Sequence, residues 1–187
     1  MEHSVYTTTS SLLGPLWISA TGTGLCGLGF GEQPDIAEVR RMVRYGIAPP
    51  EQGSGPVLEA AVAQLADYFD RRLTVFDVPL DLRGTDFQRA VWEELLTIPY
   101  GKTLTYGEVA MEVERPRAFQ AVGQANGANP IAIIVPCHRV VGRNGALTGY
   151  AAGVERKAAL LQLEQAGLQL LLRKIRNPNF LTNRPNV

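Results

Sequence analysis

A cysteine and a histidine stand side by side at Cys137 and His138, directly after Pro136 and an apolar run at 133–135. A thiol becomes a strong nucleophile when a nearby base removes its proton, and histidine is the commonest such base. A lone cysteine is more often an inert core residue, so the pair alone does not establish a reaction. The apolar run predicts a short buried strand that ends at the proline, and we expect Cys137 where regular structure stops.

The five residues at 136–140, Pro-Cys-His-Arg-Val, extend this pair into a longer motif. They resemble the active-site signature of the O6-alkylguanine-DNA alkyltransferases, and five residues in fixed order are far more specific than a Cys-His pair. The resemblance is close over 84–167 and looser over 1–80. It implies a DNA repair protein that rotates O6-alkylguanine, and also O4-alkylthymine, out of double-stranded DNA. The alkyl group would then pass irreversibly to Cys137, once per molecule.

The same resemblance implies roles for the residues around the thiol. A relay from Cys137 through water to His138 and Glu164 would remove the thiol proton. Asn129 would hold the active-site turn, and Tyr106 would donate a hydrogen bond to the guanine ring as the alkyl group departs. The implied guanine pocket consists of backbone groups at Cys137, Val140 and Ala151 together with the ring of Tyr150.

The segment 117–127 predicts a thin, nearly uncharged helix, because five of its eleven residues are Ala or Gly. Such a helix suits either close approach to a duplex or tight packing against another helix. The resemblance favours entry into the minor groove and implies DNA contacts by Arg117, Phe119, Gln120, Ala121 and Gly123. The family usually carries an arginine at the position of Gln120, where it fills the space that the flipped base leaves. Gln120 is shorter and uncharged, which predicts weaker assistance to flipping unless Phe119 acts as the wedge.

Composition restricts the possible functions. The chain has 187 residues with a formal net charge of zero, so DNA binding must be argued from a local site and not from bulk charge. Its two cysteines and two histidines lack the spacing of a zinc site or a disulfide framework. We expect reduced thiols, no cofactor, no metal and no membrane segment. The expected location is the cytoplasm, or the nucleus if the source is eukaryotic.

Alternating residues and turn signals over 5–30 predict two or three antiparallel strands. Helices are expected at 35–45 and at 56–71, where Pro56 suits a first helical turn, and 74–82 is expected to connect two domains. The resemblance implies that 1–80 form an α/β domain with a small antiparallel sheet and helices, ribonuclease H-like in fold. Cys26 lies in this half and is expected to be a core residue.

The second half, 84–170, is expected to be a mainly α-helical domain for DNA binding and alkyl acceptance, with a helix-turn-helix, winged-helix-like unit. Thr85 with Gln88 predicts a capping box, and Thr105 predicts the cap of a second helix at 106–113. A last helix is expected at 154–165, followed by a loose tail at 171–187. Glu164 near its end would oppose the helix dipole, which fits a solvated residue or one with another role.

Two other functions stay open on the residues alone. The first is a module that binds alkylated DNA but transfers the alkyl group weakly, which Gln120 favours and the Cys-His-Glu set opposes. The second is an unrelated cysteine hydrolase. We expect a monomer, and the sequence leaves open whether copies assemble cooperatively on DNA. The basic residues expected to contact phosphates in the second half are Arg115, Arg117, Arg139 and Arg143.

Overall fold

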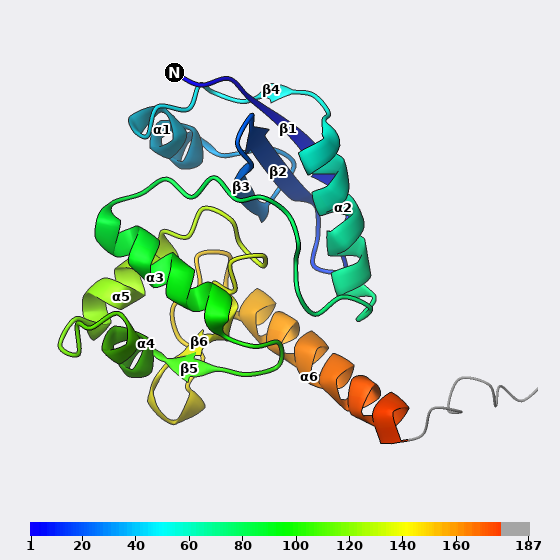
Figure 1. Ribbon diagram of the computed structural model, residues 1–187, viewed down its shortest axis with the longest axis vertical. Helices are drawn as coiled ribbons and strands as arrows, with labels where there is room; N and C mark the ends of the chain where they lie inside the picture. The colour runs from blue at the N-terminus through cyan, green and yellow to red at the C-terminus, as the bar shows by residue number, and fades with distance from the viewer. Residues whose placement is uncertain (177–187) are drawn as a thin grey trace, which may run out of the picture.

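The N-terminal half is built on three antiparallel strands, β1 (Ser4–Thr9), β2 (Leu16–Thr21) and β3 (Leu25–Phe30). A short strand, β4 (Glu51–Gln52), pairs with β1 in parallel and gives the order β3-β2-β1-β4. Figure 1 shows the computed structural model, which describes residues 1–176. The predicted antiparallel strands are confirmed, and the parallel β4 is an addition that the sequence did not indicate.

Two helices accompany this sheet. The first, α1 (Ile36–Arg44), begins where the side chain of Asp35 accepts a hydrogen bond from the backbone N–H of Glu38 at 2.8 Å. It covers a small apolar cluster that includes Cys26, which is fully buried as expected. The second, α2 (Pro56–Phe69), starts at its proline and lies along the sheet (Figure 1). Its buried face includes Leu58, Leu65 and Tyr68.

Three helices and a two-stranded ribbon open the C-terminal half. Capping boxes formed by Thr85 with Gln88 and by Thr105 with Glu108 start α3 (Asp86–Thr97) and α4 (Tyr106–Glu112). The thin helix α5 (Phe119–Gly127) follows, and Nε1 of Trp92 donates to the carbonyl of its residue Ala125 at 2.8 Å, which fastens α3 to α5. Strand β5 (Leu104–Thr105) pairs in parallel with β6 (Val140–Val141).

The two halves share one continuous apolar core and are also joined at the outer edge of β3. Leu25 exchanges backbone hydrogen bonds with Pro79 and Asp81 at 2.9 and 2.7 Å. Leu28 donates to the carbonyl of Pro130 at 2.9 Å and accepts from the N–H of Ala132 at 3.0 Å. The segment that leads to Cys137 is therefore attached to the N-terminal sheet.

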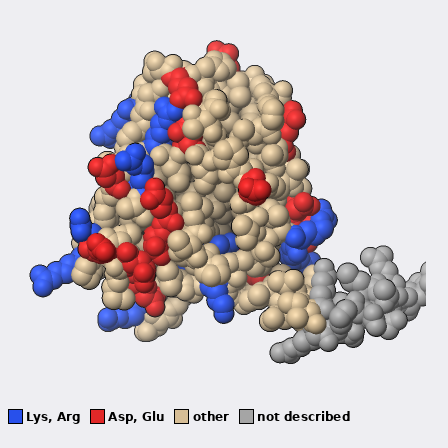
Figure 2. All heavy atoms as spheres, in the orientation of Figure 1, with Lys and Arg blue, Asp and Glu red and all other residues tan. Residues whose placement is uncertain are grey.

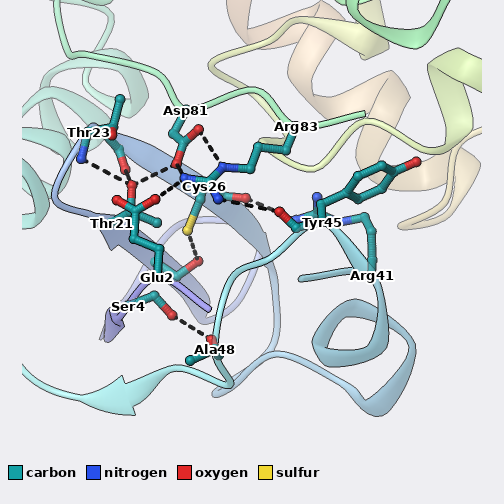
Figure 3. Close-up of polar contacts among 12 residues, drawn as sticks. Glu2, Ser4, Thr21, Thr23, Cys26, Arg41, Tyr45, Ala48, Asp81 and Arg83 are labelled. Atoms are coloured by element: carbon teal, nitrogen blue, oxygen red, sulfur yellow. Dashed lines mark hydrogen bonds and ion pairs between the residues drawn. The ribbon is translucent and has the colours of Figure 1, made fainter. Parts of the chain in front are cut away.

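A polar cluster fixes the connection between the halves to the sheet (Figure 3). Asp81 accepts from the hydroxyl of Thr21 at 2.7 Å and from Nε and Nη2 of Arg83 at 2.9 and 2.7 Å. Arg83 also pairs with Glu2 and donates to the carbonyl of Tyr45 at 3.3 Å. We call these residues the Asp81 cluster.

The strand predicted before Cys137 is wrong. Residues 133–135 are buried as expected, but they form a turn and a bend, and Ile133 adopts a left-handed conformation with φ of 70° that no strand allows. Local hydrogen bonds replace strand pairing, because Ile134 donates to the carbonyl of Ala132 and Val135 to that of Ile131. Cys137 instead begins a 3-10 helix, η1 (Cys137–Arg139).

The last helix is longer than predicted. Helix α6 spans Val154–Arg176, so it includes the first six residues of the expected tail, and the remainder of that tail, 177–187, lies outside the described residues. Gly167 lies inside this helix and allows Tyr100 to approach closely, because a Cβ there would clash with the hydroxyl of Tyr100. Across residues 1–176, no helix combines the length and apolar character needed to cross a membrane.

Candidate active site

Cys137 lies at the start of η1, almost fully buried, on the wall of a cleft of about 500 Å³. Asn129 shapes the turn before it: Nδ2 donates to the carbonyl of Val135 at 2.8 Å, and Oδ1 accepts from the N–H of Ile131 at 3.0 Å. Nδ2 of Asn126 donates to the carbonyl of Cys137 at 3.3 Å. The position of the thiol is therefore fixed by the backbone and by two asparagines.

Burial raises the pKa of the Cys137 thiol to about 11, although a hydrogen bond with Asn129 and the charge of Lys157 act in the opposite direction. A thiol with this pKa is protonated at neutral pH. Since the thiolate is the reactive form, the site needs a base that can take the proton during the reaction.

His138 and Glu164 form a fully buried pair, in which Nε2 of His138 lies 2.8 Å from Oε1 of Glu164. Burial lowers the pKa of His138, so the imidazole is neutral at neutral pH. A carboxylate accepts a hydrogen bond, which places the ring proton on Nε2 and leaves Nδ1 as the basic atom. Within residues 1–176, Nδ1 has no hydrogen-bond partner. The pair therefore presents a basic nitrogen on the residue that follows the thiol in the chain.

Glu164 is held by several donors at once. Arg139 contacts both carboxylate oxygens, with Nε 3.0 Å from Oε2 and Nη2 2.9 Å from Oε1. The N–H of Gly101 donates to Oε2 at 2.9 Å, and the hydroxyl of Tyr68 donates to Oε1 at 2.9 Å. Burial would raise the pKa of Glu164, but the bonds and charges of His138 and Arg139 outweigh it and lower the pKa to about 2. Glu164 is a buried carboxylate, and it is not the helix-end residue expected from the sequence.

Lys157 belongs to this site and was missed by sequence reasoning. Its side chain is fully buried on α6, and Nζ donates to the carbonyl of Thr148 at 2.8 Å. Nζ also lies 5.7 Å from the ring centroid of Tyr106. Burial lowers the pKa of this lysine, while the nearby Cys137 raises it. The spacing of Lys157, Leu160 and Glu164 along one helical face was a signal that could have identified it.

The implied guanine-binding residues are only partly brought together. Tyr150 and Ala151 line the cleft with Cys137, whereas Val140 is buried in β6 and does not line it. Tyr106 donates its hydroxyl to the carbonyls of Thr148 and Gly149 at 3.1 and 3.2 Å and so holds the loop that crosses the site. The N-terminal residues Trp17, Phe30 and Arg41 also line the cleft, which their local sequence gave no reason to expect.

The implied DNA-contacting residues lie on α5 and the turn before it, outside the lining of the cleft that contains Cys137. Arg117, Phe119 and Gln120 are exposed, and Phe119 retains 53% of its accessible surface. Ala121 and Gly123 are half-buried, and a Cβ at Gly123 would lie 3.9 Å from the ring of Tyr106. Helix α5 is therefore exposed at Phe119 and Gln120, while Gly123 on the same helix faces the ring of Tyr106.

The charge distribution corrects one prediction and adds a constraint. Arg139, expected to contact phosphate, is buried against Glu164 and is not available to DNA. Acidic side chains gather over α3 and α4 on the left of the view in Figure 2. The exposed carboxylates of these helices include Asp86, Glu93, Glu108 and Glu112. This face would repel a phosphate backbone.

Models of two families match most of the chain. Residues 4–82 match the ribonuclease-like domain of 6-O-methylguanine DNA methyltransferase, and residues 86–166 match the DNA-binding domain of the same protein. A methylated-DNA–protein-cysteine methyltransferase of Mycobacterium bovis is 50% identical over 161 residues, covering 86% of this chain and 92% of that protein. A Methanosarcina mazei protein of the same name is 56% identical over 106 residues, covering 57% of this chain and 67% of its own length.

Solved structures agree with these matches. The crystal structure of the O6-methylguanine methyltransferase of Mycobacterium tuberculosis superposes with a TM-score of 0.76 at 48% identity, covering 90% of this chain and 99% of that one. A structure of the M. tuberculosis protein in complex with DNA gives a TM-score of 0.73 at 50% identity, covering 87% and 93%. Both predicted halves of the fold, the small sheet with helices and the helical DNA-binding part, are confirmed. The chain belongs to the methylated-DNA–protein-cysteine methyltransferase family.

Proposed function

We propose that this protein repairs alkylated double-stranded DNA by moving the alkyl group from O6 of guanine to the sulfur of Cys137, once per molecule. The observation that carries the proposal is the buried thiol of Cys137 on the wall of a cleft, followed in the chain by His138. Nε2 of His138 binds the buried carboxylate of Glu164. O4-alkylthymine is included as a second substrate, because it presents an alkyl ether to the same nucleophile. The protein acts as a monomer in this proposal, and titration of protein onto duplex DNA would show any cooperative assembly.

The proton and electron balance of the transfer follows from this arrangement. The thiol proton passes to Nδ1 of His138, and since no direct hydrogen bond joins the two side chains within residues 1–176, a water molecule would carry it. The sulfur forms a bond to the alkyl carbon while the bond from that carbon to O6 breaks. The electron pair goes to guanine, where a hydrogen bond from Tyr106 stabilises the charge. The product is a thioether, which has no route back to the thiol.

In this proposal the transfer step requires a rearrangement of the hydrogen bonds between Tyr106 and the loop at 148–149. Tyr106 now donates to two carbonyls of that loop and has to exchange those bonds to reach guanine. Lys157 donates to the carbonyl of Thr148 independently, so the loop stays attached to α6 when Tyr106 turns away. We assign Lys157 to this function and also to the stabilisation of negative charge on the sulfur.

The proposed DNA surface is the exposed edge of α5 and the turn before it. Arg115 and Arg117 are exposed there, next to Phe119 and Gln120, whereas α3 and α4 present carboxylates (Figure 2). Phe119 or Gln120 would fill the stack that the flipped base leaves. Ala121 and Gly123 allow the duplex to approach closely.

An alkylated-DNA binding module with weak transfer is the second candidate. It is favoured by Gln120, which lacks the length and charge of the arginine usual at this position. It is disfavoured by the complete buried set of Cys137, His138 and Glu164, which a pure binding module does not need.

The test is incubation with a duplex that contains one O6-methylguanine, followed by intact mass and peptide mapping. We expect one added methyl group, located on Cys137, and repair that stops at one lesion per molecule. The Cys137→Ser variant is the control and should remain unmodified. Repair of several lesions per molecule, or methylation of the fully buried Cys26 with Cys137 unmodified, would show that the proposal is wrong.

A further inference from the structure

Glu164 receives one of its hydrogen bonds from the N-terminal half of the chain. The hydroxyl of Tyr68, on α2, donates to Oε1 of Glu164 at 2.9 Å, across 96 residues of sequence. His138 binds the same oxygen atom at 2.8 Å. All three side chains are fully buried. A tyrosine and the candidate base therefore share one carboxylate oxygen.

The other donors to Glu164 come from nearby parts of the C-terminal half, namely Arg139 and the backbone of Gly101. Among the described residues, Tyr68 is the one donor to this carboxylate that the N-terminal half supplies. Its ring packs edge-on against Tyr100, with centroids 6.1 Å apart, which fixes the direction of the hydroxyl. The charged and titratable side chains around the His138–Glu164 pair are Tyr68 on α2, Tyr100 after α3, Cys137 and Arg139 on η1, and Lys157 on α6.

We propose that Tyr68 is a positioning residue for the alkyl transfer, through which the N-terminal half holds Glu164 and limits how strongly this carboxylate attracts a protonated His138. The inference rests on the proposed function, because it takes His138 as the acceptor of the thiol proton. It assigns the sheet-bearing half, which supplies no reacting group, a direct effect on the chemistry.

The physical reason is competition for one oxygen. A hydroxyl that donates to Oε1 stabilises part of the negative charge on that atom, and hydrogen bonds to buried charged groups are among the strong ones. Burial raises the pKa of Tyr68, with the charge of Glu164 adding to the effect, so the hydroxyl remains a donor at neutral pH. Without it, Glu164 would attract the imidazolium more strongly and raise the pKa of His138. Since only neutral imidazole accepts the proton, the acidic limb of the rate profile would move to higher pH.

The experiment is single-turnover methyl transfer from an O6-methylguanine duplex to the full chain, measured from about pH 5 to about pH 9. We expect Tyr68→Phe to move the acidic limb upward by about half a pH unit, which slows transfer on that limb by about threefold and changes the rate above it little. Tyr100→Phe is the matched control. Its hydroxyl is buried in the same aromatic cluster but has no hydrogen-bond partner within residues 1–176, so its profile should match the wild type.

A titration of the His138 ring by NMR gives a second reading that does not depend on turnover. The chain has one other histidine, the exposed His3, and His3→Gln leaves a single histidine signal to assign. In Tyr68→Phe the pKa of His138 should rise relative to the wild type.

Three results would overturn the inference. One is a Tyr68→Phe profile equal to the wild type, and another is a lower rate with an unmoved acidic limb, which would indicate lost packing only. The third is an equal shift in Tyr100→Phe, which would assign the effect to the aromatic cluster. Each leaves the proposed function intact as long as the wild type methylates Cys137, whereas failure of that methylation would refute the proposed function itself.

Discussion

Each half of the described chain contains a cluster in which an arginine pairs with a carboxylate, and the two clusters differ in burial. In the Asp81 cluster, Arg83 binds Asp81 and Glu2, with Thr21 as a further donor to Asp81 (Figure 3). In the other, Arg139 binds Glu164. The side chains of Arg83 and Asp81 are 25% and 10% exposed, against 8% and 0% for Arg139 and Glu164. Arg83 and Asp81 are neighbours in the sequence, and their cluster reaches distant segments through Glu2 and Thr21, whereas Arg139 lies 25 residues from Glu164.

What separates the two clusters is the group that shares the carboxylate. Asp81 is shared with a hydroxyl that does not ionise, whereas Glu164 is shared with His138, an imidazole that follows Cys137 in the chain and whose Nδ1 has no hydrogen-bond partner within residues 1–176. An ion pair by itself has a structural role, because it holds two side chains in place. Chemistry requires in addition a group that changes protonation near neutral pH and a cleft that admits a substrate.

The largest effect expected from this comparison is on the C-terminal pair. Glu164→Gln removes the charge that orients His138 and stabilises its protonated form, so transfer should slow by roughly 10²-fold. Affinity for the lesion should change little, because Glu164 is fully buried and does not line the cleft. Single-turnover rates and lesion binding measured on the same preparation check this. A fall in affinity as steep as the fall in rate would assign Glu164 to structure and make the two clusters alike.

The matched change in the N-terminal half is Asp81→Asn. It leaves Arg83 with a weaker partner at a partly exposed site, which should cost about 1–2 kcal/mol of unfolding free energy after allowance for solvent screening. The rate of transfer per folded molecule should equal that of the wild type. Urea unfolding measures the loss of stability, and the single-turnover rate measures the chemistry. A rate loss comparable to that of Glu164→Gln would show that the Asp81 cluster also affects the chemistry.

The smallest expected effect lies outside both clusters. Gln120→Arg supplies a longer planar cation to fill the vacated stack and should speed repair of duplex DNA several-fold. Reaction with free O6-benzylguanine, which has no stack to leave, should stay unchanged. The comparison with Phe119→Ala decides the alternative: if the arginine variant is no faster and Phe119→Ala is slow on duplex alone, Phe119 is the wedge.

Local patterns predicted much of the fold. The capping boxes at Thr85 and Thr105 and the proline start at Pro56 depend on neighbouring residues, and the structure has each helix there. The strand before Cys137 failed because burial alone does not distinguish a strand from a buried turn, and Ile133 takes the left-handed conformation. The predicted end of the last helix at 165 was wrong, because α6 continues to Arg176 and places Gly167 against Tyr100, a residue 67 positions earlier in the chain.

Prediction of the site was limited in the same way, because several of its contacts join residues that are distant in the sequence. The motif at 136–140 identified the thiol and its neighbour, yet Arg139 was assigned to phosphate because its partner Glu164 lies 25 residues away. Tyr68 is 96 residues from Glu164, and no local sequence pattern predicts a contact between residues so far apart. Lys157 was recoverable from its helical face and was missed because a lysine there usually points to solvent.

The outer edge of β3 has a consequence for synthesis on the ribosome. Its first part is covered by residues 79–81 and its second part by residues 130–132, which are translated about one hundred residues after Leu28. At about 5–20 residues per second, the second part waits about 5–20 seconds with open backbone groups, and such an edge can pair with another nascent chain. The segment that covers this second part leads directly to Cys137, so the candidate nucleophile reaches its place only when this edge of the sheet is covered.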